Sequence, residues 1–459
     1  MKELLKKLQI KPAQILALGF FGLIIFGALL LNLPIASNDG QSIGLVNAFF
    51  TSTSAVCVTG LVVANSMEQW TLFGKIVIII LIQIGGLGVM TLATTFFLLL
   101  GKKIGLKERL VIQEALNQNK ISGVVRLTRN IIFGTLVIEG IGALILMFRF
   151  LPDYTFIESL GLGIFHSISA FCNAGFDVLS FNSLSPYVHD WTVNLTISGL
   201  IILGGLGFTV WHDLIDTTRE TIRKKRHHGY WFHSLALHTK LVLVLTTTLL
   251  SVGFILFFLL EMNNPGTMQD FSWPQKVLAS FFQSVTTRTA GFNTIALDQM
   301  TDGSKFITII LMFIGGSPAG TAGGIKTVTL GVVFFSVMST IRSREETEVF
   351  HRRIPDDIIK RSLAIIMMSL GVIISVTIIL TITENQTFLD AAFEAVSAFA
   401  TVGLSLGITG ELSVIGKIVI AITMFIGRLG PMTFAVAMAI RYDRKKISVR
   451  KPSERVMVG

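Results

Sequence analysis

Long runs of apolar residues alternate with short charged stretches along the chain, and their lengths indicate membrane-crossing helices. A helix needs roughly 20 residues to cross the hydrocarbon core of a bilayer. We predict spans over residues 15–33, 73–100, 131–150, 193–211, 241–260, 306–338, 362–382 and 414–440. Lys2, Lys6 and Lys7 precede the first run. It is longer than the core of a signal peptide, with no obvious small-x-small cleavage site after it, so we count it as a span.

Shorter apolar stretches stand between the two members of each pair of predicted spans. They cover residues 43–63, 157–176, 273–292 and 388–404. Each has an apolar helical pattern that is too short to cross a bilayer, followed by a segment of small residues. Irregular backbone at membrane depth is tolerated where it lines a watery cavity or is packed in protein. Each stretch therefore predicts a re-entrant helix and loop.

These stretches are four copies of one unit, which can be aligned on a glycine. The aligned glycines are Gly60, Gly175, Gly291 and Gly403. Ten positions earlier every copy has a phenylalanine, at Phe50, Phe165, Phe281 and Phe393. A second glycine motif follows 24 to 29 residues later, beginning at Gly85, Gly204, Gly315 and Gly427. Four matches in register indicate one supersecondary unit used repeatedly.

The repeats predict an all-α membrane protein. We expect eight spanning helices, arranged as four parallel repeats of helix, re-entrant pore helix with its loop, and helix around one central pore. The proposed boundaries are residues 1–105, 106–222, 223–345 and 346–459. The third repeat has an interrupted second helix, and the fourth ends in a cytoplasmic tail.

The loop tips carry the candidate chemistry. The fourth tip reads T-V-G-L, which is close to the start of the potassium-channel filter sequence T-V-G-Y-G, where backbone carbonyls replace the hydration shell of K⁺. Glycine supplies backbone angles that other residues resist, and the C-terminal end of a preceding helix favours a cation. We predict that K⁺ binds to backbone carbonyls of a filter formed by Val58, Thr59, Gly60, Asn173, Ala174, Gly175, Thr289, Ala290, Gly291, Thr401, Val402 and Gly403.

Composition and charge agree with a membrane protein. Charged residues make up 14% of the 459 residues, against about 25% in ordinary globular proteins. Thirty of the 38 lysines and arginines lie in residues 2–11, 102–129, 219–240, 342–361 and 441–455. The positive-inside rule places these segments, and both termini, on the cytoplasmic side of the plasma membrane. This distribution explains the net charge of +10 without nucleic acid.

The sixth predicted span is too long for a simple crossing and is interrupted. Residues 315–324 read G-G-S-P-A-G-T-A-G-G, and glycine and proline at this density cannot continue a helix. A phosphate-binding loop would need glycine directly before Lys326, where Ile325 stands. An unwound segment below the filter predicts a mobile gate, and its candidate residues are Gly315, Gly316, Pro318, Gly320, Gly323, Gly324, Lys326 and Arg428.

Two arginines lie inside apolar segments, where an unpaired cation costs several kcal/mol. Arg428 occupies the place in repeat four that matches the gate. It either anchors loop carbonyls or holds the gate closed and adds an electrostatic barrier. We expect Arg288 to point behind the filter and pair with Asp177 or Glu394.

Two features have a packing interpretation. The G-G-L-G motifs beginning at Gly85 and Gly204 fit close approach of helices, because small residues allow it. Cys57 and Cys172 occupy matching places in two repeats, and we interpret them as small packed side chains rather than a disulfide.

The whole chain resembles the membrane subunits of the Trk/Ktr/HKT potassium-transporter superfamily, most closely the bacterial KtrB type. The resemblance rests on the four-fold unit, the loop tips, T-R-T-A-G-F at 287–292 and G-G-x-x-x-G-T-A-G-G-I-K at 315–326. It implies one pore per chain, a gate in the third repeat, and a K⁺ preference associated with Gly60. It also implies a homodimer docked on a cytosolic nucleotide-binding regulatory ring of the KtrA type.

We therefore expect a K⁺-translocating subunit of a Ktr-type uptake system, with no enzymatic activity and no cofactor in this chain besides the transported K⁺. The alternative is a secondary cation transporter with alternating access, a class that often has inverted repeats and broken helices. The copies here are parallel, which favours a pore. An intramembrane enzyme ranks third, because the spans contain neither paired aspartates nor the usual metalloprotease or serine-hydrolase motifs.

Overall fold

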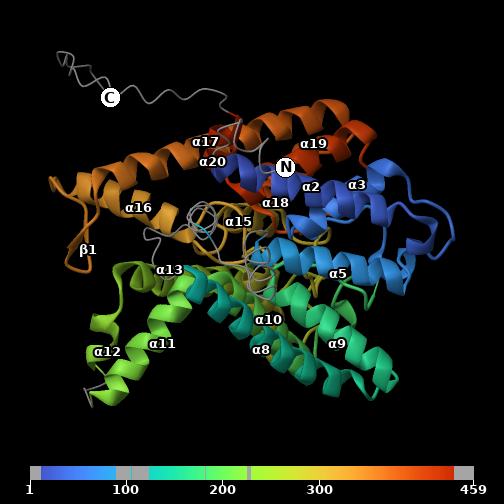
Figure 1. Ribbon diagram of the computed structural model, residues 1–459, viewed down its shortest axis with the longest axis horizontal. Helices are drawn as coiled ribbons and strands as arrows, with labels where there is room; N and C mark the ends of the chain where they lie inside the picture. The colour runs from blue at the N-terminus through green and yellow to red at the C-terminus, as the bar shows by residue number, and fades with distance from the viewer. Residues whose placement is uncertain (1–11, 89–104, 106–123, 181, 225–228, 439–459) are drawn as a thin grey trace.

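The computed structural model describes residues 12–88, 105, 124–180, 182–224 and 229–438 (Figure 1). Nearly all regular structure in these ranges is helical. The sheet found there is a small antiparallel pair, β1 (Glu348–Val349) with β2 (Arg352–Arg353). The basic segments 2–11 and 441–455, most of 102–129, and the ends of the predicted spans 73–100 and 414–440 lie outside the described residues.

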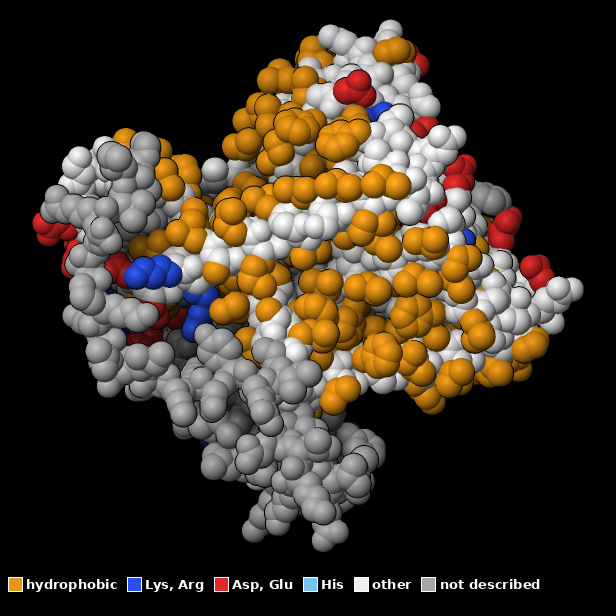
Figure 2. Space-filling view, turned by 90° about the horizontal axis from the view of Figure 1, so that it is seen from above, with side chains coloured by type: hydrophobic (Ala, Val, Ile, Leu, Met, Phe, Trp, Pro, Cys, Tyr) orange, Lys and Arg blue, Asp and Glu red, His pale blue; other side chains and the backbone are white. Residues whose placement is uncertain are grey.

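Four helices are long and apolar enough to cross a membrane: α2 (Pro12–Leu31), α8 (Val124–Phe150), α13 (Leu237–Glu261) and α17 (Asp356–Thr383). They expose many large apolar side chains, among them Phe26, Phe133 and Met367. Figure 2 shows hydrophobic side chains in broad bands over one face, with charged side chains toward its edges. An apolar surface of this extent suits contact with lipid rather than water.

Four short helices stand where the sequence predicts helices too short to cross a bilayer, which confirms their existence and length, whereas their re-entry into the membrane stays a prediction. They are α3 (Leu45–Val56), α9 (Phe156–Phe171), α14 (Trp273–Thr286) and α18 (Phe388–Ala400). A capping box starts α9, in which Thr155 and Glu158 satisfy each other's backbone N–H groups. The C-terminal halves of all four helices are buried.

A second helix follows each short one: α5 (Leu72–Leu87), α10 (Trp191–Leu206), α15 (Asp302–Phe313) and α19 (Val414–Leu429). The helices thus form four units, numbered one to four along the chain, that begin with α2, α8, α13 and α17. Each second helix packs on the short helix of the next unit: α5 on α9, α10 on α14, α15 on α18, and α19 on α3. The last contact closes the circle, and the colours in Figure 1 accordingly run around the centre from blue to red.

One packing contact recurs in units one, two and three. A serine of the short helix donates a hydrogen bond to a carbonyl of the first helix, at 2.7 Å from Ser52 to Ile24, 2.6 Å from Ser167 to Glu139, and 2.8 Å from Ser284 to Leu250. A glycine of the first helix makes room for each serine, at Gly27, Gly142 and Gly253. These contacts set the distance between the first helix and the short helix.

The predicted spans 193–211 and 414–440 are wrong as single helices. Helix α10 meets α11 (Phe208–Arg223) at 93°, and α19 meets α20 (Pro431–Met438) at 100°. The bends occur at Gly207 and Gly430, whose φ angles of 90° and 82° are accessible to glycine without strain. By length and composition, four described helices qualify as spans, or up to six if each bent pair is one span. The count of eight stays a prediction.

The predicted interruption of span 306–338 is confirmed. Helix α15 ends at Phe313, and α16 (Thr327–Ile341) begins after residues 315–324, hereafter the intramembrane loop. Gly315 N donates to Ile325 O at 2.9 Å, which closes the base of this loop. The remaining elements are short: η1 (Pro34–Ala36), α4 (Ser66–Gln69), η2 (Ser185–Tyr187), α12 (Gly229–Ser234) and η3 (Ile408–Gly410).

Candidate functional site

The four aligned glycines lie side by side and line one pocket with a volume of about 210 Å³. Each glycine faces the carbonyl that precedes the aligned glycine of the next unit. A methyl group built on it would lie 2.5 Å from Ala174 O at Gly60, 2.6 Å from Ala290 O at Gly175, 2.5 Å from Val402 O at Gly291, and 2.1 Å from Thr59 O at Gly403. These distances are shorter than van der Waals contact, so the tips need glycine here.

The backbone takes the same unusual course in every tip. Two residues before each glycine, a non-glycine residue has left-handed angles, with φ of 51° at Val58, 58° at Asn173, 64° at Thr289 and 52° at Thr401. Valine and threonine rarely adopt such angles, whereas asparagine tolerates them. The residue types do not reveal this strain, because only Asn173 is of a type that favours left-handed angles.

Hydroxyl groups of the short helices hold the tips in place. Ser54 and Ser397 each accept a hydrogen bond from the aligned glycine N–H, both at 3.1 Å, and Ser169 donates to Phe176 O at 2.8 Å. In unit three the aligned residue is Val285, and the next residue, Thr286, donates to Phe292 O instead. A hydroxyl in the last turn of the helix therefore anchors each strained tip.

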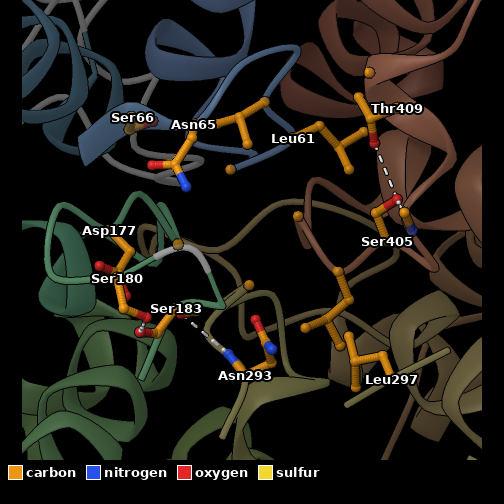
Figure 3. A pocket seen from close by; sticks show the side chains of 18 residues that line it. Leu61, Asn65, Ser66, Asp177, Ser180, Ser183, Asn293, Leu297, Ser405 and Thr409 are labelled. Carbon is orange, nitrogen blue, oxygen red and sulfur yellow. Dashed lines mark hydrogen bonds between the residues drawn. The ribbon is translucent and has the colours of Figure 1, made fainter. Parts of the chain in front are cut away.

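Polar side chains surround the pocket on one side of the glycines. Figure 3 shows that they come from all four units, with Asn65, Asp177, Asn293 and Thr409 arranged around the pocket. Asn293 N donates to Ser183 Oγ at 3.3 Å, which joins units three and two. Asp177 is the carboxylate among the lining residues. The pocket therefore has polar residues from all four units in its lining.

The intramembrane loop lies on the opposite side of the glycines from the pocket. A methyl group on Gly323 would lie 2.0 Å from Thr401 Oγ1, and one on Gly324 would lie 3.1 Å from the Ala400 Cα. The loop thus contacts residues that precede an aligned glycine, whereas residues that follow the glycines line the pocket. The aligned glycines therefore stand between the pocket and the loop.

The predicted gate residues lie in or against this loop. Gly315 and Gly316 pack against Gly323 and Ala322 within the loop. Pro318 and Gly320 lie against Gly207 of unit two, and Lys326 Nζ donates to Ala322 O at 2.6 Å.

Arg428 of α19 joins this loop to unit one. Its guanidinium donates to Thr321 O in the loop and to Gly85 O and Gly86 O in α5, the last at 3.1 Å. The predicted contact between Arg428 and loop carbonyls is therefore present, and the same side chain also spans to a neighbouring unit.

The expected pairing of Arg288 with Asp177 or Glu394 is wrong. Arg288 donates to Gly315 O at 3.3 Å, at the start of the intramembrane loop. Asp177 accepts from Leu179 N, and Glu394 accepts from a threonine of its own unit. Arg288 precedes its aligned glycine and contacts the loop, whereas Asp177 follows its glycine and belongs to the residues that line the pocket.

The packing interpretation of the second glycine motif is confirmed. Methyl groups on Gly85 and Gly204 would lie 2.0 Å from Val56 O and 1.9 Å from Phe171 O, at the ends of α3 and α9. Cys57 and Cys172 are buried and free, as expected for packed side chains.

Gly85→Ala is expected to lower the thermal unfolding temperature of the purified protein in detergent, because its methyl group would overlap a backbone carbonyl that cannot easily move. Gly199→Ala is the matched control, since nothing lies within 4 Å of a methyl group there and alanine favours a helix interior. Equal unfolding temperatures for the two variants would contradict the packing role of Gly85.

A family model described as the cation transport protein TrkH matches residues 21–450. The chain belongs to this family of cation transport proteins. It is 44% identical over 457 residues to the Ktr system potassium uptake protein B of Bacillus subtilis (strain 168), an alignment that covers 100% of this chain and 99% of that protein. It is 38% identical to the potassium/sodium uptake protein NtpJ of Enterococcus hirae, with coverage of 100% and 99%.

The fold of the family is also that of this chain. The crystal structure of the potassium transporter TrkH from Vibrio parahaemolyticus superposes with a TM-score of 0.71, covering 93% of this chain and 84% of that one at 19% sequence identity. Family membership and the apolar helices make the chain a multi-pass membrane transporter.

Proposed function

We propose that this chain is the pore-forming, K⁺-translocating subunit of a Ktr-type K⁺ uptake system. The observation that carries the proposal is the closed order of the aligned glycines, each against a carbonyl of the next unit. Four loops that converge in this way present backbone oxygens to one axis, which is how K⁺ filters replace the water around the ion. The name of the relative that is 44% identical supports potassium as the ion.

The filter consists of the three residues ending at each aligned glycine. In unit one these are Val58, Thr59 and Gly60. The side chains of Val58 and Thr59 are buried and do not line the pocket. Backbone carbonyl groups rather than carboxylates therefore contact the ion. The left-handed residue and the following glycine turn successive carbonyls toward the axis. The outer pocket with Asp177 receives the hydrated ion before the filter strips its water.

The intramembrane loop acts as the gate. It lies directly beneath the filter, where Gly323 touches Thr401, and it is fixed there by hydrogen bonds from Arg428 and Arg288. Two guanidinium groups near the axis also repel a cation that leaves the filter. Opening requires the loop to move away from Thr401, and its glycines allow that movement.

The wider assembly follows the sequence expectations. We assign the four pore repeats to residues 1–105, 106–222, 223–345 and 346–459, with eight crossings and both termini in the cytoplasm. A homodimer of chains, each with its own pore, docks on a cytosolic nucleotide-binding regulatory ring. The name of the Bacillus relative, a protein of a Ktr system, supports a multicomponent assembly.

Uptake by liposomes containing the purified chain tests the proposal. We expect K⁺ and Rb⁺ to enter down their gradients and Na⁺ to enter more slowly, without a coupling ion on the opposite side. The alternative is a secondary transporter, and the potassium/sodium name of the Enterococcus relative motivates a Na⁺-coupled arm of the assay. Uptake that requires a Na⁺ gradient would favour alternating access over a pore.

A further inference from the structure

Asn173 differs from the residues at the same place in the other three tips. The others are Val58, Thr289 and Thr401. Val58 has no polar side-chain atom, and no hydrogen-bond partner of the Thr289 and Thr401 hydroxyls occurs within the described residues. Asn173 uses both ends of its amide. Nδ2 donates to Arg288 O at 3.3 Å, and Oδ1 accepts from Thr321 Oγ1 at 3.0 Å. One side chain thus links two tips and the intramembrane loop.

Thr321 is the counterpart of Asn173 in the loop. Its hydroxyl oxygen lies 3.0 Å from Asn173 Oδ1 and 3.1 Å from the carbonyl oxygen of Phe171, which is the last residue of α9. Its carbonyl accepts from Arg428, and its N–H donates to Gly204 O at 3.3 Å. Both Asn173 and Thr321 are buried, with exposed fractions of 1% and 0%. Water does not replace the bond between them while the loop stays in place.

The surrounding chain leaves room for this pair. A methyl group on Gly204 would lie 2.7 Å from Asn173 Oδ1 and 2.9 Å from Thr321 Oγ1. The first glycine of the motif in unit two therefore admits the amide and the hydroxyl, besides packing against α9.

We propose that Asn173 and Thr321 are positioning residues that couple the filter to the gate, an inference that rests on the proposed function. With the loop in place, Thr321 holds the Asn173 amide, and the amide holds tip two against the Arg288 carbonyl at the start of tip three. When the loop leaves, Asn173 loses its buried partner, and the contact between tips two and three is free to change. The loop therefore sets the shape of the filter as well as blocking its exit.

Coupling predicts cross effects that a purely local role does not. Thr321→Val removes a hydroxyl in the gate and keeps the shape of the side chain. We expect it to lower the K⁺:Na⁺ uptake ratio about fivefold, the size of effect that loss of one buried hydrogen bond gives. Asn173→Gly removes the amide in the filter and keeps the left-handed backbone. We expect it to raise K⁺ uptake through the chain by a similar factor.

The two changes break the same link, so their effects should not add. The double variant Asn173→Gly with Thr321→Val is expected to match the stronger single variant in both uptake rate and ion ratio. Thr321→Ser keeps a hydroxyl at this position, unlike Thr321→Val, and should therefore keep the wild-type ion ratio. Thr308→Val is the matched control, because the Thr308 hydroxyl is equally buried but donates to Ser304 O at 2.8 Å within its own helix α15. It should keep the wild-type ion ratio.

The outcomes separate the two proposals. A wild-type chain that passes K⁺ and Na⁺ equally would overturn the filter and the coupling together. A selective wild-type chain whose Thr321→Val variant keeps its ion ratio would overturn the coupling alone. Strictly additive effects in the double variant would do the same, since independent sites add. If Asn173→Gly does not fold, Thr321→Val and Thr321→Ser still decide the matter by the ion ratio.

Discussion

Gly60→Ser is expected to lower the preference of uptake for K⁺ over Na⁺ by about tenfold, which corresponds to about 1.4 kcal/mol. Gly60 has a φ of 95°, and its α-hydrogen faces Ala174 O of the next unit, where a Cβ would lie 2.5 Å away. A serine therefore has to push tip one away from tip two. The carbonyls of Thr59 and Gly60 then leave their places around the ion, and a filter with wider spacing discriminates less by ion size.

The measurement is the ratio of K⁺ to Na⁺ uptake in liposomes at equal amounts of protein. Gly40→Ser is the matched control, because Gly40 has a left-handed φ of 64° and nothing lies within 4 Å of a Cβ there. It introduces the same kind of backbone strain away from the four aligned glycines and should leave the K⁺:Na⁺ ratio unchanged. A Gly60→Ser variant that discriminates as well as the wild type would count against carbonyl selection at this tip.

Arg428→Ala is expected to raise K⁺ uptake by about tenfold, because charge-assisted hydrogen bonds are the strong ones and this side chain makes several. Its guanidinium joins Thr321 O of the intramembrane loop to Gly85 O and Gly86 O of unit one. Alanine releases the loop from α5 and removes a positive charge beneath the filter. Initial rates of K⁺ uptake, compared at equal reconstitution, measure the effect.

Two further variants divide this effect into its parts. Arg428→Lys keeps the charge but cannot bridge several carbonyls as the planar guanidinium does. If holding the loop matters more than the charge, the lysine variant will be nearly as fast as the alanine variant. Lys417→Ala removes another cation of α19, one that contacts Asn47 Oδ1 at 3.2 Å and not the loop. It should retain the wild-type rate, and unchanged or slower uptake by Arg428→Ala would contradict a closing role for this arginine.

The helices near the ring could be predicted from the sequence because repetition and apolar length identify them. The phenylalanines and glycines recur at fixed spacing, so the short helices and their tips could be placed without coordinates. The break at residues 315–324 was equally plain, since glycine and proline cannot continue a helix. These signals depend on residue type and spacing along the chain, which a single sequence contains.

Contacts between units could not be predicted in the same way. The left-handed angles at Val58 and Thr401 are imposed by the fold on residues that disfavour them. The bends at Gly207 and Gly430 depend on one glycine among many. The sequence predicts an ion pair for Arg288 because a buried cation is often paired with a carboxylate. In the structure Arg288 instead donates a hydrogen bond to a backbone carbonyl. The hydrogen-bond partner of a buried polar group depends on the three-dimensional arrangement. Neither the residue type of that group nor its spacing along the sequence reveals the partner.

Closure of the circle by α19 against α3 has a genetic consequence. A channel assembled from four identical subunits repeats every mutation four times, so its filter changes symmetrically or not at all. Here the four units are separate parts of one chain, so each can mutate independently of the others. Asn173 of unit two and Arg288 of unit three therefore each occur once, so under the proposed function a single mutation can change one contact between filter and gate without altering the other tips.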